Sequence, residues 1–274
     1  MLSSIINAFS SKPSIALGGT DKIVTCKILE ITQESPDTKL FKIGLPDKNS
    51  VLGLLPGQHM RIVTEIEGKE TFRTYTPVRY QTPGEFECVI KIYKDGQLTP
   101  WLDSLKVEDN INIYGPIGMI KVDEGNIYTK VTTKEVMLQK PKKVGMIAGG
   151  SGITPMMQLV DTTAADSNEV DFKLIYSNKT VDDILCKKEL ESYGNKLKVL
   201  NTITRQEELP AGYNKGRINK DLIANFLDSD TDVIAICGPP DFTSVAKEIC
   251  ESLFEGYAYV GGKSGAFMFK KWFC

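Results

Sequence analysis

Three short segments of this sequence carry residue types that could bind a phosphorylated ligand with a planar ring. In the first, residues 149–155 (GGSGITP), glycines follow an apolar run and precede a helical pattern. Glycines let the backbone approach a ligand closely, and the free N–H groups at the start of a helix favour a diphosphate. The spacing differs from the dinucleotide pattern G-x-G-x-x-G, so this turn alone indicates a phosphate site only weakly, and many such turns serve packing.

The second segment, residues 237–240 (CGPP), follows an apolar run that is typical of a buried parallel strand. Ligands bind at the carboxyl edge of open α/β sheets, which is where this stiff turn would hold Cys237. By itself, a cysteine at such a position is more often a small buried apolar residue. Because the glycine turn is expected at the same edge, the two segments together favour a binding site.

The third segment, residues 73–77, reads Arg-Thr-Tyr-Thr-Pro. In a strand, Arg73, Tyr75 and Pro77 would share one face, and the two threonines would share the other. An arginine can hold a phosphate through two parallel hydrogen bonds, and a tyrosine ring can lie against a planar heterocycle. An ordinary half-buried edge strand would account for the same residues.

The elements that must position these segments fall into two regions of different pattern. Before about residue 121, short alternating runs separated by Pro and Gly turns predict an antiparallel barrel or sandwich. After residue 141, apolar runs alternate with helical patterns, the first from Pro155, which predicts a parallel sheet covered on both faces. The predicted strands are 23–29, 40–43, 60–64, 86–93 and 110–114 in the first region, and 143–148, 171–176, 197–202 and 232–237 in the second.

Composition excludes several classes of function. The chain has 274 residues, a net charge of −2 and no apolar stretch long enough to span a membrane, so neither a general nucleic-acid binder nor a spanning helix is expected. Its six cysteines show no Cys-x-x-Cys spacing, and His59 is the single histidine. Zinc, iron–sulfur and bis-histidine haem sites are therefore poorly supported, and no metal site is predicted. Redox chemistry would need a bound organic cofactor.

Two further segments allow more than one interpretation. Residues 1–12 contain no acid and place apolar residues at helical spacing, which fits a membrane-surface helix, a targeting segment, a partner-docking helix or a frayed terminus. The segment between the two regions is rich in lysine and is either a solvated linker or a docking patch for an acidic partner. The lysines concerned are Lys130, Lys134, Lys140, Lys142 and Lys143.

Taken together and in this order, the three segments resemble those of the NADH-cytochrome b5 reductase family, within the ferredoxin reductase-like flavoenzymes. The resemblance runs from about residue 22 to about residue 269. It implies an FAD-binding antiparallel β-barrel at residues 20–122, an interdomain linker at 123–141 and an NAD-binding α/β domain at 142–274. It also implies hydride transfer from NADH and single-electron transfer to a haem protein such as cytochrome b5. Further matching stretches are residues 56–59 (PGQH), 89–93 (VIKIY), 115–118 (GPIG) and 177–180 (SNKT).

The resemblance implies roles for individual residues. Arg73 would bind the FAD diphosphate and Tyr75 the isoalloxazine. Thr76 would hydrogen-bond the flavin near N5, with His59 behind it as a route for a proton. Cys237 would lie beside the nicotinamide. The other implied cofactor-binding residues are Thr74, Val89, Lys91, Tyr93, Gly96, Gln97, Leu98, Thr99, Gly150, Gly152, Thr154, Pro155, Asn178, Thr204, Arg205, Gly238 and Pro239.

Three departures from the family pattern matter. Residues 95–99 read DGQLT where the family usually has GGKMS, so phosphate binding would fall to backbone N–H groups and to Thr99. Thr204-Arg205 replaces the family's Asp-Arg, which removes a charge that disfavours a 2′-phosphate and makes NADPH a second hypothesis beside NADH. Five residues follow Phe269, and they would pack near the interdomain crevice or bind a partner.

Alternatives stay open for the electron acceptor, for the role of the chain and for its cellular location. The acceptor could instead be a quinone, a ferric chelate or a ferredoxin-like protein. The chain could also be a weakly active or inactive structural subunit of a larger assembly, as the changes at residues 95–99 and the tail suggest. We expect the cytosol-facing surface of a membrane or the mitochondrion, with no transmembrane helix and no secretion.

Overall fold

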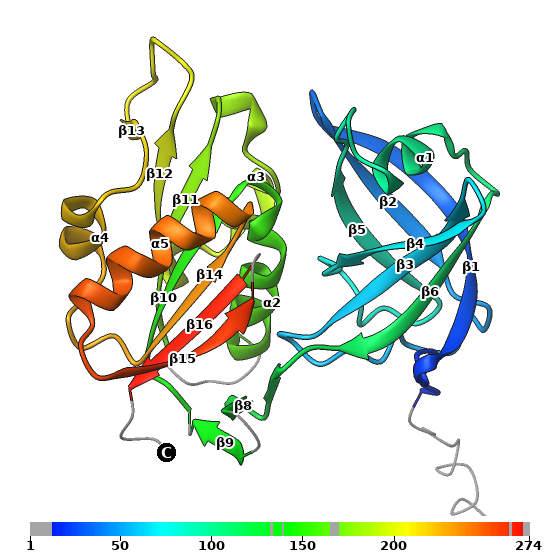
Figure 1. Cartoon of the computed structure of the whole chain (residues 1–274), viewed down its shortest axis with the longest axis horizontal. Coiled ribbons are helices and arrows are strands. Elements are labelled where there is room, and N and C mark those ends of the chain that lie inside the picture. Colours follow the sequence, from blue (N-terminus) through cyan, green and yellow to red (C-terminus); the bar gives the residue numbers. More distant parts are fainter. Residues whose placement is uncertain (1–12, 132–133, 139, 165–169, 263–264, 271–274) are drawn as a thin grey trace, which may run out of the picture.

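The computed structural model describes residues 13–131, 134–138, 140–164, 170–262 and 265–270, which form two domains side by side (Figure 1). The predicted docking or targeting segment, residues 1–12, lies outside the described residues, as do residues 271–274 of the tail. Among the helices of the described chain, none is long and apolar enough to cross a membrane.

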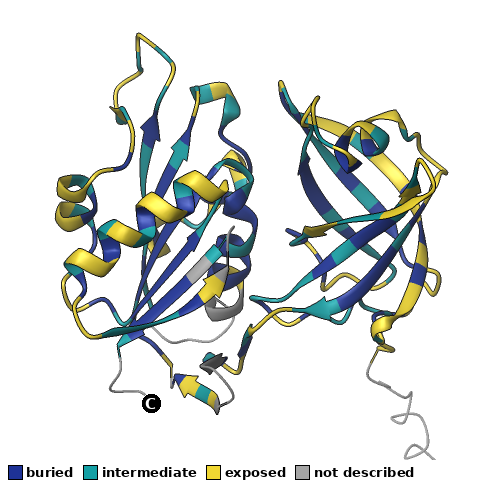
Figure 2. Ribbon diagram, viewed as in Figure 1, coloured by how far each residue is buried: buried dark blue, intermediate teal, exposed yellow. Residues whose placement is uncertain are grey.

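The first domain is a curled six-stranded antiparallel sheet with the strand order β4-β3-β6-β1-β2-β5. Alternate residues such as Val24, Cys26 and Ile28 point into its core, as the period of a strand requires (Figure 2). After β4 the chain returns to β5, where the Val78 N–H donates to the Glu87 carbonyl at 2.9 Å, so the sheet closes as the predicted barrel. Its elements are β1 (Gly19–Ser35), β2 (Thr38–Gly44), β3 (His59–Ile66), β4 (Lys69–Tyr75), β5 (Glu85–Lys91), α1 (Leu98–Ser104) and β6 (Asn110–Ile117).

The second domain is a seven-stranded sheet with the order β13-β12-β11-β10-β14-β16-β15. Its first five strands are parallel, as predicted, but β16 pairs antiparallel with both β14 and β15. The α2 helix packs on one face of the sheet, and α4 and α5 pack on the other. The elements are β10 (Lys143–Gly149), α2 (Ile153–Ala164), β11 (Asp171–Asn178), α3 (Lys187–Ser192), β12 (Leu197–Ile203), β13 (Tyr213–Lys215), α4 (Lys220–Phe226), β14 (Val233–Cys237), α5 (Pro240–Leu253), β15 (Tyr257–Gly262) and β16 (Gly265–Lys270).

The segment predicted as a solvated linker is structured instead. It forms a three-stranded antiparallel sheet of β7 (Ile120–Asp123), β8 (Asn126–Val131) and β9 (Lys134–Leu138). Val122, Ile127 and Leu138 are buried in the same apolar cluster as the core of the second domain, which explains why this segment folds onto that domain. These side chains alternate with polar ones, a strand pattern that the lysine content obscured.

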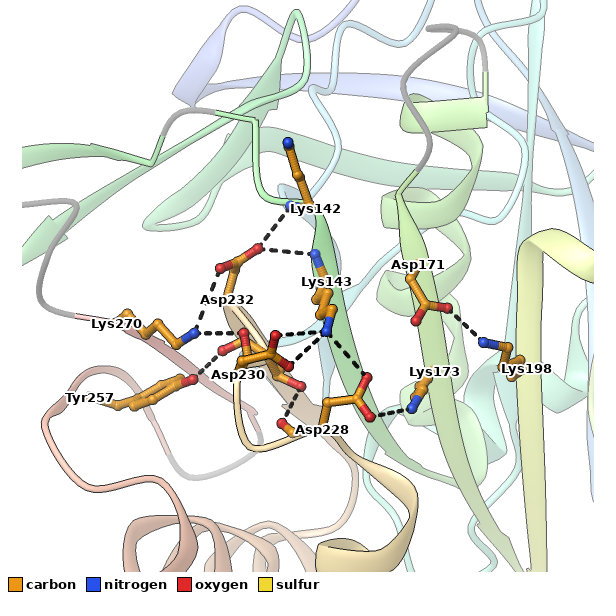
Figure 3. A network of polar contacts seen from close by, with 11 residues as sticks. Lys142, Lys143, Asp171, Lys173, Lys198, Asp228, Asp230, Asp232, Tyr257 and Lys270 are labelled. Carbon is orange, nitrogen blue, oxygen red and sulfur yellow. Dashed lines mark hydrogen bonds and ion pairs between the residues drawn. The ribbon is translucent and has the colours of Figure 1, made fainter.

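A network of lysines and aspartates ties together the strand ends farthest from the carboxyl edge of the parallel sheet (Figure 3). The Asp232 carboxylate accepts hydrogen bonds from the backbone N–H groups of Lys142 and Lys143, at 2.9 and 3.0 Å. The Lys143 ammonium pairs with Asp230 at 2.7 Å. Lys143, one of the lysines considered for a docking patch, therefore serves the fold.

Candidate active site

A cavity of about 710 Å³ lies between the two domains. Its walls come from β4, β5 and the turn before α1 in the first domain, and from the glycine turn and the β14 end in the second. The cavity brings together most of the residues that the sequence singled out: His59, Arg73, Thr74, Tyr75, Thr76, Val89, Lys91, Tyr93, Gly96, Gln97, Leu98, Thr99, Gly152, Thr154, Pro155, Cys237, Gly238 and Pro239.

The third sequence segment supplies one wall from the edge strand β4. Arg73, Thr74, Tyr75 and Thr76 all line the cavity, although strict alternation would have turned the threonines away from it. For Thr76 the reason is that β4 ends at Tyr75, so the pleat does not continue through Thr76 and Pro77, whereas Thr74 lies within the strand. Pro77 is buried and does not line the cavity.

Arg73 connects this strand with the turn that precedes α1. Its guanidinium donates to the Gln97 side-chain carbonyl at 3.1 Å, which places the two predicted diphosphate-binding segments next to each other. Gly96 is required there, because a Cβ would lie 2.6 Å from the Thr99 hydroxyl oxygen. That hydroxyl donates to the Tyr93 carbonyl and accepts from the Tyr93 N–H, each at 3.0 Å. The Thr99 hydroxyl thus closes the turn, which leaves backbone N–H groups as the donors for a phosphate.

Two titratable side chains of this wall, those of His59 and Tyr75, are held in their neutral forms. Burial, together with the nearby charge of Arg61, lowers the pKa of His59 below its ordinary value, so its imidazole is neutral at pH 7. Burial raises the pKa of Tyr75 well above its ordinary value. The Lys91 ammonium forms an ion pair with the Asp37 carboxylate at 2.6 Å. The uncharged rings of His59 and Tyr75, beside the paired ammonium of Lys91, suit a large planar ligand.

The opposite wall begins at the glycine turn. After β10 comes one short 3-10 turn, Gly150–Gly152, and α2 starts at Ile153, two residues before the predicted start. A Cβ on Gly152 would lie 2.2 Å from the Cys237 carbonyl oxygen, so the turn packs directly on the end of β14. The Tyr176 hydroxyl donates to the Gly150 carbonyl at 3.0 Å and holds the turn from below.

Cys237 is the half-buried cysteine at the carboxyl end of β14, and the other cysteines of the described residues are buried. Burial raises the pKa of its thiol to about 11, so the thiol is protonated at neutral pH. A neutral thiol fits contact with a ligand ring better than nucleophilic catalysis.

Four predicted residues lie outside the cavity lining: Gly150, Asn178, Thr204 and Arg205. Three of them cluster at the carboxyl ends of β11 and β12, where the Thr204 N–H and the Arg205 N–H donate to the carbonyls of Asn178 and Lys179. The Asn178 side chain is buried, and both of its polar atoms lack a hydrogen-bond partner among the described residues. A buried amide without partners is unusual, which makes Asn178 a notable residue at this edge of the sheet.

Sequence reasoning missed part of the lining. Met119 and Ile120 lie near the end of the predicted barrel range, residues 20–122, but were not singled out there. Val260, Gly261, Gly265 and Phe267 come from the β15–β16 hairpin. Two apolar runs, 257–260 and 266–269, flank the glycines at 261, 262 and 265. This pattern predicts two strands joined by a turn, so the hairpin could have been recognised in the sequence. Phe269 instead pairs with Val233, at the end of β14 that lies opposite Cys237.

The residues present fit a flavin and a nicotinamide nucleotide. The cavity volume lies within the usual range for cofactor sites, roughly 300–1,000 Å³. Arg73 and the Gly96 turn offer donors for one diphosphate, and the Gly152 turn offers a second close approach of backbone. An antiparallel barrel joined to an α/β domain, with the site between them, defines a two-domain flavin-dependent oxidoreductase of ferredoxin reductase-like fold.

Comparisons with known proteins agree with this class. The profile described as "Oxidoreductase FAD-binding domain" matches residues 25–122, and that described as "Oxidoreductase NAD-binding domain" matches residues 146–248. NADH-cytochrome b5 reductase 2 of Danio rerio is 36% identical over 232 residues, which cover 78% of this chain and 75% of the relative. NADH-cytochrome b5 reductase 1 of Rattus norvegicus is 31% identical over 256 residues, which cover 86% and 84%.

A solved structure gives the same result. The cytochrome b5 reductase domain of Ulva prolifera nitrate reductase superposes with a TM-score of 0.78 at 30% identity, over 88% of this chain and 96% of that one. The chain belongs to the cytochrome b5 reductase family. It is a flavoprotein reductase that depends on NAD(P)H, with one FAD-binding and one NAD-binding domain.

Proposed function

We propose that this reductase takes a hydride from NADH and passes single electrons to a haem protein such as cytochrome b5. The observation that carries the proposal is the cavity, in which Arg73, Tyr75 and Thr76 of one domain face Thr154 and Cys237 of the other. When bound, FAD supplies the conversion of one two-electron donation into two single-electron deliveries. The names of the relatives, NADH-cytochrome b5 reductases, support the choice of donor and acceptor.

We assign FAD to residues 20–122 and the nucleotide to residues 142–274, ranges that contain the two profile matches. In the first range Arg73 and the backbone of residues 96–99 would bind the FAD diphosphate. Tyr75 would lie on the flavin ring, and Thr76 would bond near its N5 atom. His59, neutral and half-buried, would hold or accept a proton behind Thr76. Ligands that fill the cavity would exclude water from these groups.

In the second range, the turn ending at Pro155 and the Cys237–Pro240 turn would hold the nicotinamide end, with the thiol of Cys237 beside the ring. The buried amide of Asn178 would bind the nucleotide farther along the sheet edge. Thr204 and Arg205 lie at the same edge and would meet the 2′ position of the adenosine ribose. No acid stands at position 204, so we propose that NADPH is used beside NADH.

The acceptor separates the proposal from its rivals. We expect purified FAD-loaded protein to reduce cytochrome b5 under NADH with a higher kcat/KM than a quinone or a ferric chelate, measured side by side from the haem absorbance and NADH oxidation. A clear preference for a quinone or chelate would instead identify a reductase for that acceptor. Protein that binds no flavin would support the structural-subunit alternative.

The cellular location, a membrane surface or the mitochondrion, is proposed on the family resemblance alone. Fractionation of cells that express the tagged chain would test a membrane-surface or mitochondrial position. Recovery only in the supernatant after membranes and organelles are removed would contradict it. Deletion of residues 1–12 in the same assay would show whether that segment carries the attachment.

A further inference from the structure

A buried glutamine of α2 reaches from the nucleotide domain into the other domain. Gln158 has no exposed surface. Its side-chain carbonyl accepts a hydrogen bond from the Gly57 backbone N–H at 3.1 Å, and its amide nitrogen donates to the Pro77 carbonyl at 2.9 Å. One carboxamide thus joins two separate backbone segments of the antiparallel domain.

Both partners of Gln158 lie next to cavity residues. Gly57 precedes His59 by two positions, and Pro77 directly follows Thr76. On the helix, Gln158 stands one turn after Thr154, so the two side chains share a face of α2. The carboxamide therefore connects the helix that begins at the nucleotide-binding turn with the ends of two flavin-side segments.

The backbone at Gly57 is shaped for this contact. Its φ of 85° belongs to a region that residues other than glycine rarely adopt, and a Cβ there would lie 3.1 Å from the Ile120 carbonyl oxygen. Because the Gln158 side chain and the Gly57 backbone are both confined, the Gly57 N–H has little freedom to find another partner. Removing the Gln158 carboxamide would leave a donor and an acceptor buried without partners.

Other contacts join the domains farther from the cavity. The Cys186 N–H donates to the Glu34 carboxylate at 3.0 Å, and Arg79 pairs with Glu189 at 2.6 Å. Arg79 is about half exposed, with 47% of its side-chain surface accessible, and exposed ion pairs hold geometry weakly. Gln158 differs from that ion pair in being fully buried and in lying beside the site.

We propose that Gln158 is a positioning residue for hydride transfer. Its carboxamide fixes how closely the nucleotide-binding end of α2 approaches the flavin-side segments at Gly57 and Pro77. This role rests on the proposed function, because it takes the cavity as the place where flavin and nicotinamide meet. Transfer rates depend steeply on such distances, and a misplacement of about 1 Å can slow a reaction about 100-fold.

The test compares FAD-loaded wild-type protein with Gln158→Met, which keeps the length of the side chain and removes both hydrogen bonds. Two quantities are measured: the limiting anaerobic rate at which NADH bleaches the flavin absorbance, and the hydrogen-exchange rate of the Gly57 amide. We expect the bleaching rate to fall about tenfold or more, with the apparent Kd for NADH and the FAD content little changed. The Gly57 amide should exchange faster.

Two further variants separate positioning from loss of stability. Gln158→Asn keeps a buried amide but shortens the side chain, so it should slow bleaching even where its Tm matches the wild type, and it serves if the methionine variant does not fold. Thr231→Val is the matched control. It removes a buried hydrogen bond to the Asp228 carbonyl at the opposite sheet edge, and it should lower Tm without changing bleaching or exchange at Gly57.

Unchanged bleaching in both Gln158 variants, within about twofold of wild type, would overturn the positioning role. Unchanged exchange at Gly57 in Gln158→Met would also overturn it. Failure of the proposed function is a different observation, because wild-type protein that carries FAD would then show no bleaching by NADH before any variant is compared.

Discussion

The side chain at position 204 decides how the nucleotide edge treats a 2′-phosphate under our proposal. Thr204 is uncharged and its neighbour Arg205 is exposed, so position 204 places no negative charge beside a 2′-phosphate. We predict that Thr204→Asp lowers kcat/KM for NADPH about tenfold or more while NADH is little affected, because like charges at close range cost several kcal/mol. Initial rates with both nucleotides measure this preference.

Thr204→Asn is the control for that change, since asparagine has the size of aspartate without its charge. It should leave the ratio of NADPH to NADH activity within about twofold of wild type. Equal losses in the two variants would show that size rather than charge matters at this position, and would remove the support for NADPH use.

At the scale of elements, the glycine turn packs so closely on the end of β14 that it leaves no room for a side chain at Gly152. We predict that Gly152→Ala lowers kcat/KM for NADH about tenfold or more and destabilises the fold by about 1–3 kcal/mol, because the new Cβ would meet the Cys237 carbonyl at 2.2 Å and backbone must shift. Thermal unfolding and steady-state rates measure the two effects.

Gly194→Ala gives the comparison for that variant. Gly194 has a positive φ of 54°, but a Cβ there would meet no atom within 4 Å, and the residue lies in the turn before β12, away from the cavity. We expect some loss of stability from the strained backbone and no loss in kcat/KM. If both alanine variants lose activity equally, close packing at Gly152 is not the cause.

The sequence could predict the elements whose signals are local. The apolar run before residue 149, the glycines after it and the alternation before residue 121 each lie within a few positions. The β15–β16 hairpin was not predicted although its two apolar runs signal it, and the β7–β9 sheet was not predicted because its lysine content obscured the strand pattern. The end of β4 at Tyr75, after which Thr76 lines the cavity, was not predicted either, because tertiary packing decides where this strand stops.

Gln158 shows the same limit at the site. In the sequence it stands inside an apolar helical run, Met156-Met157-Gln158-Leu159-Val160, where it looks like an irregularity of a core helix. Its partners Gly57 and Pro77 are 101 and 81 positions away. A contact of this kind depends on how two domains meet, which periodicity within one helix does not reveal.

At the scale of the whole molecule, both domains contribute residues to one cavity. A shared apolar cluster contains Val78 and Val89 of the barrel together with Met156 and Met157 of α2, so the domains pack as partners. Under our proposal, this packing would allow a ligand held by Arg73 and Tyr75 to meet one held by Gly152 and Cys237.

Anaerobic titration of the purified protein tests this account most directly. We predict a yellow protein that contains one FAD and loses its flavin absorbance on addition of one equivalent of NADH, with NADPH acting in the same way. A protein that carries FAD, is bleached by dithionite and yet stays yellow with both nucleotides would contradict the central claim that the cavity between the domains is a site of hydride transfer.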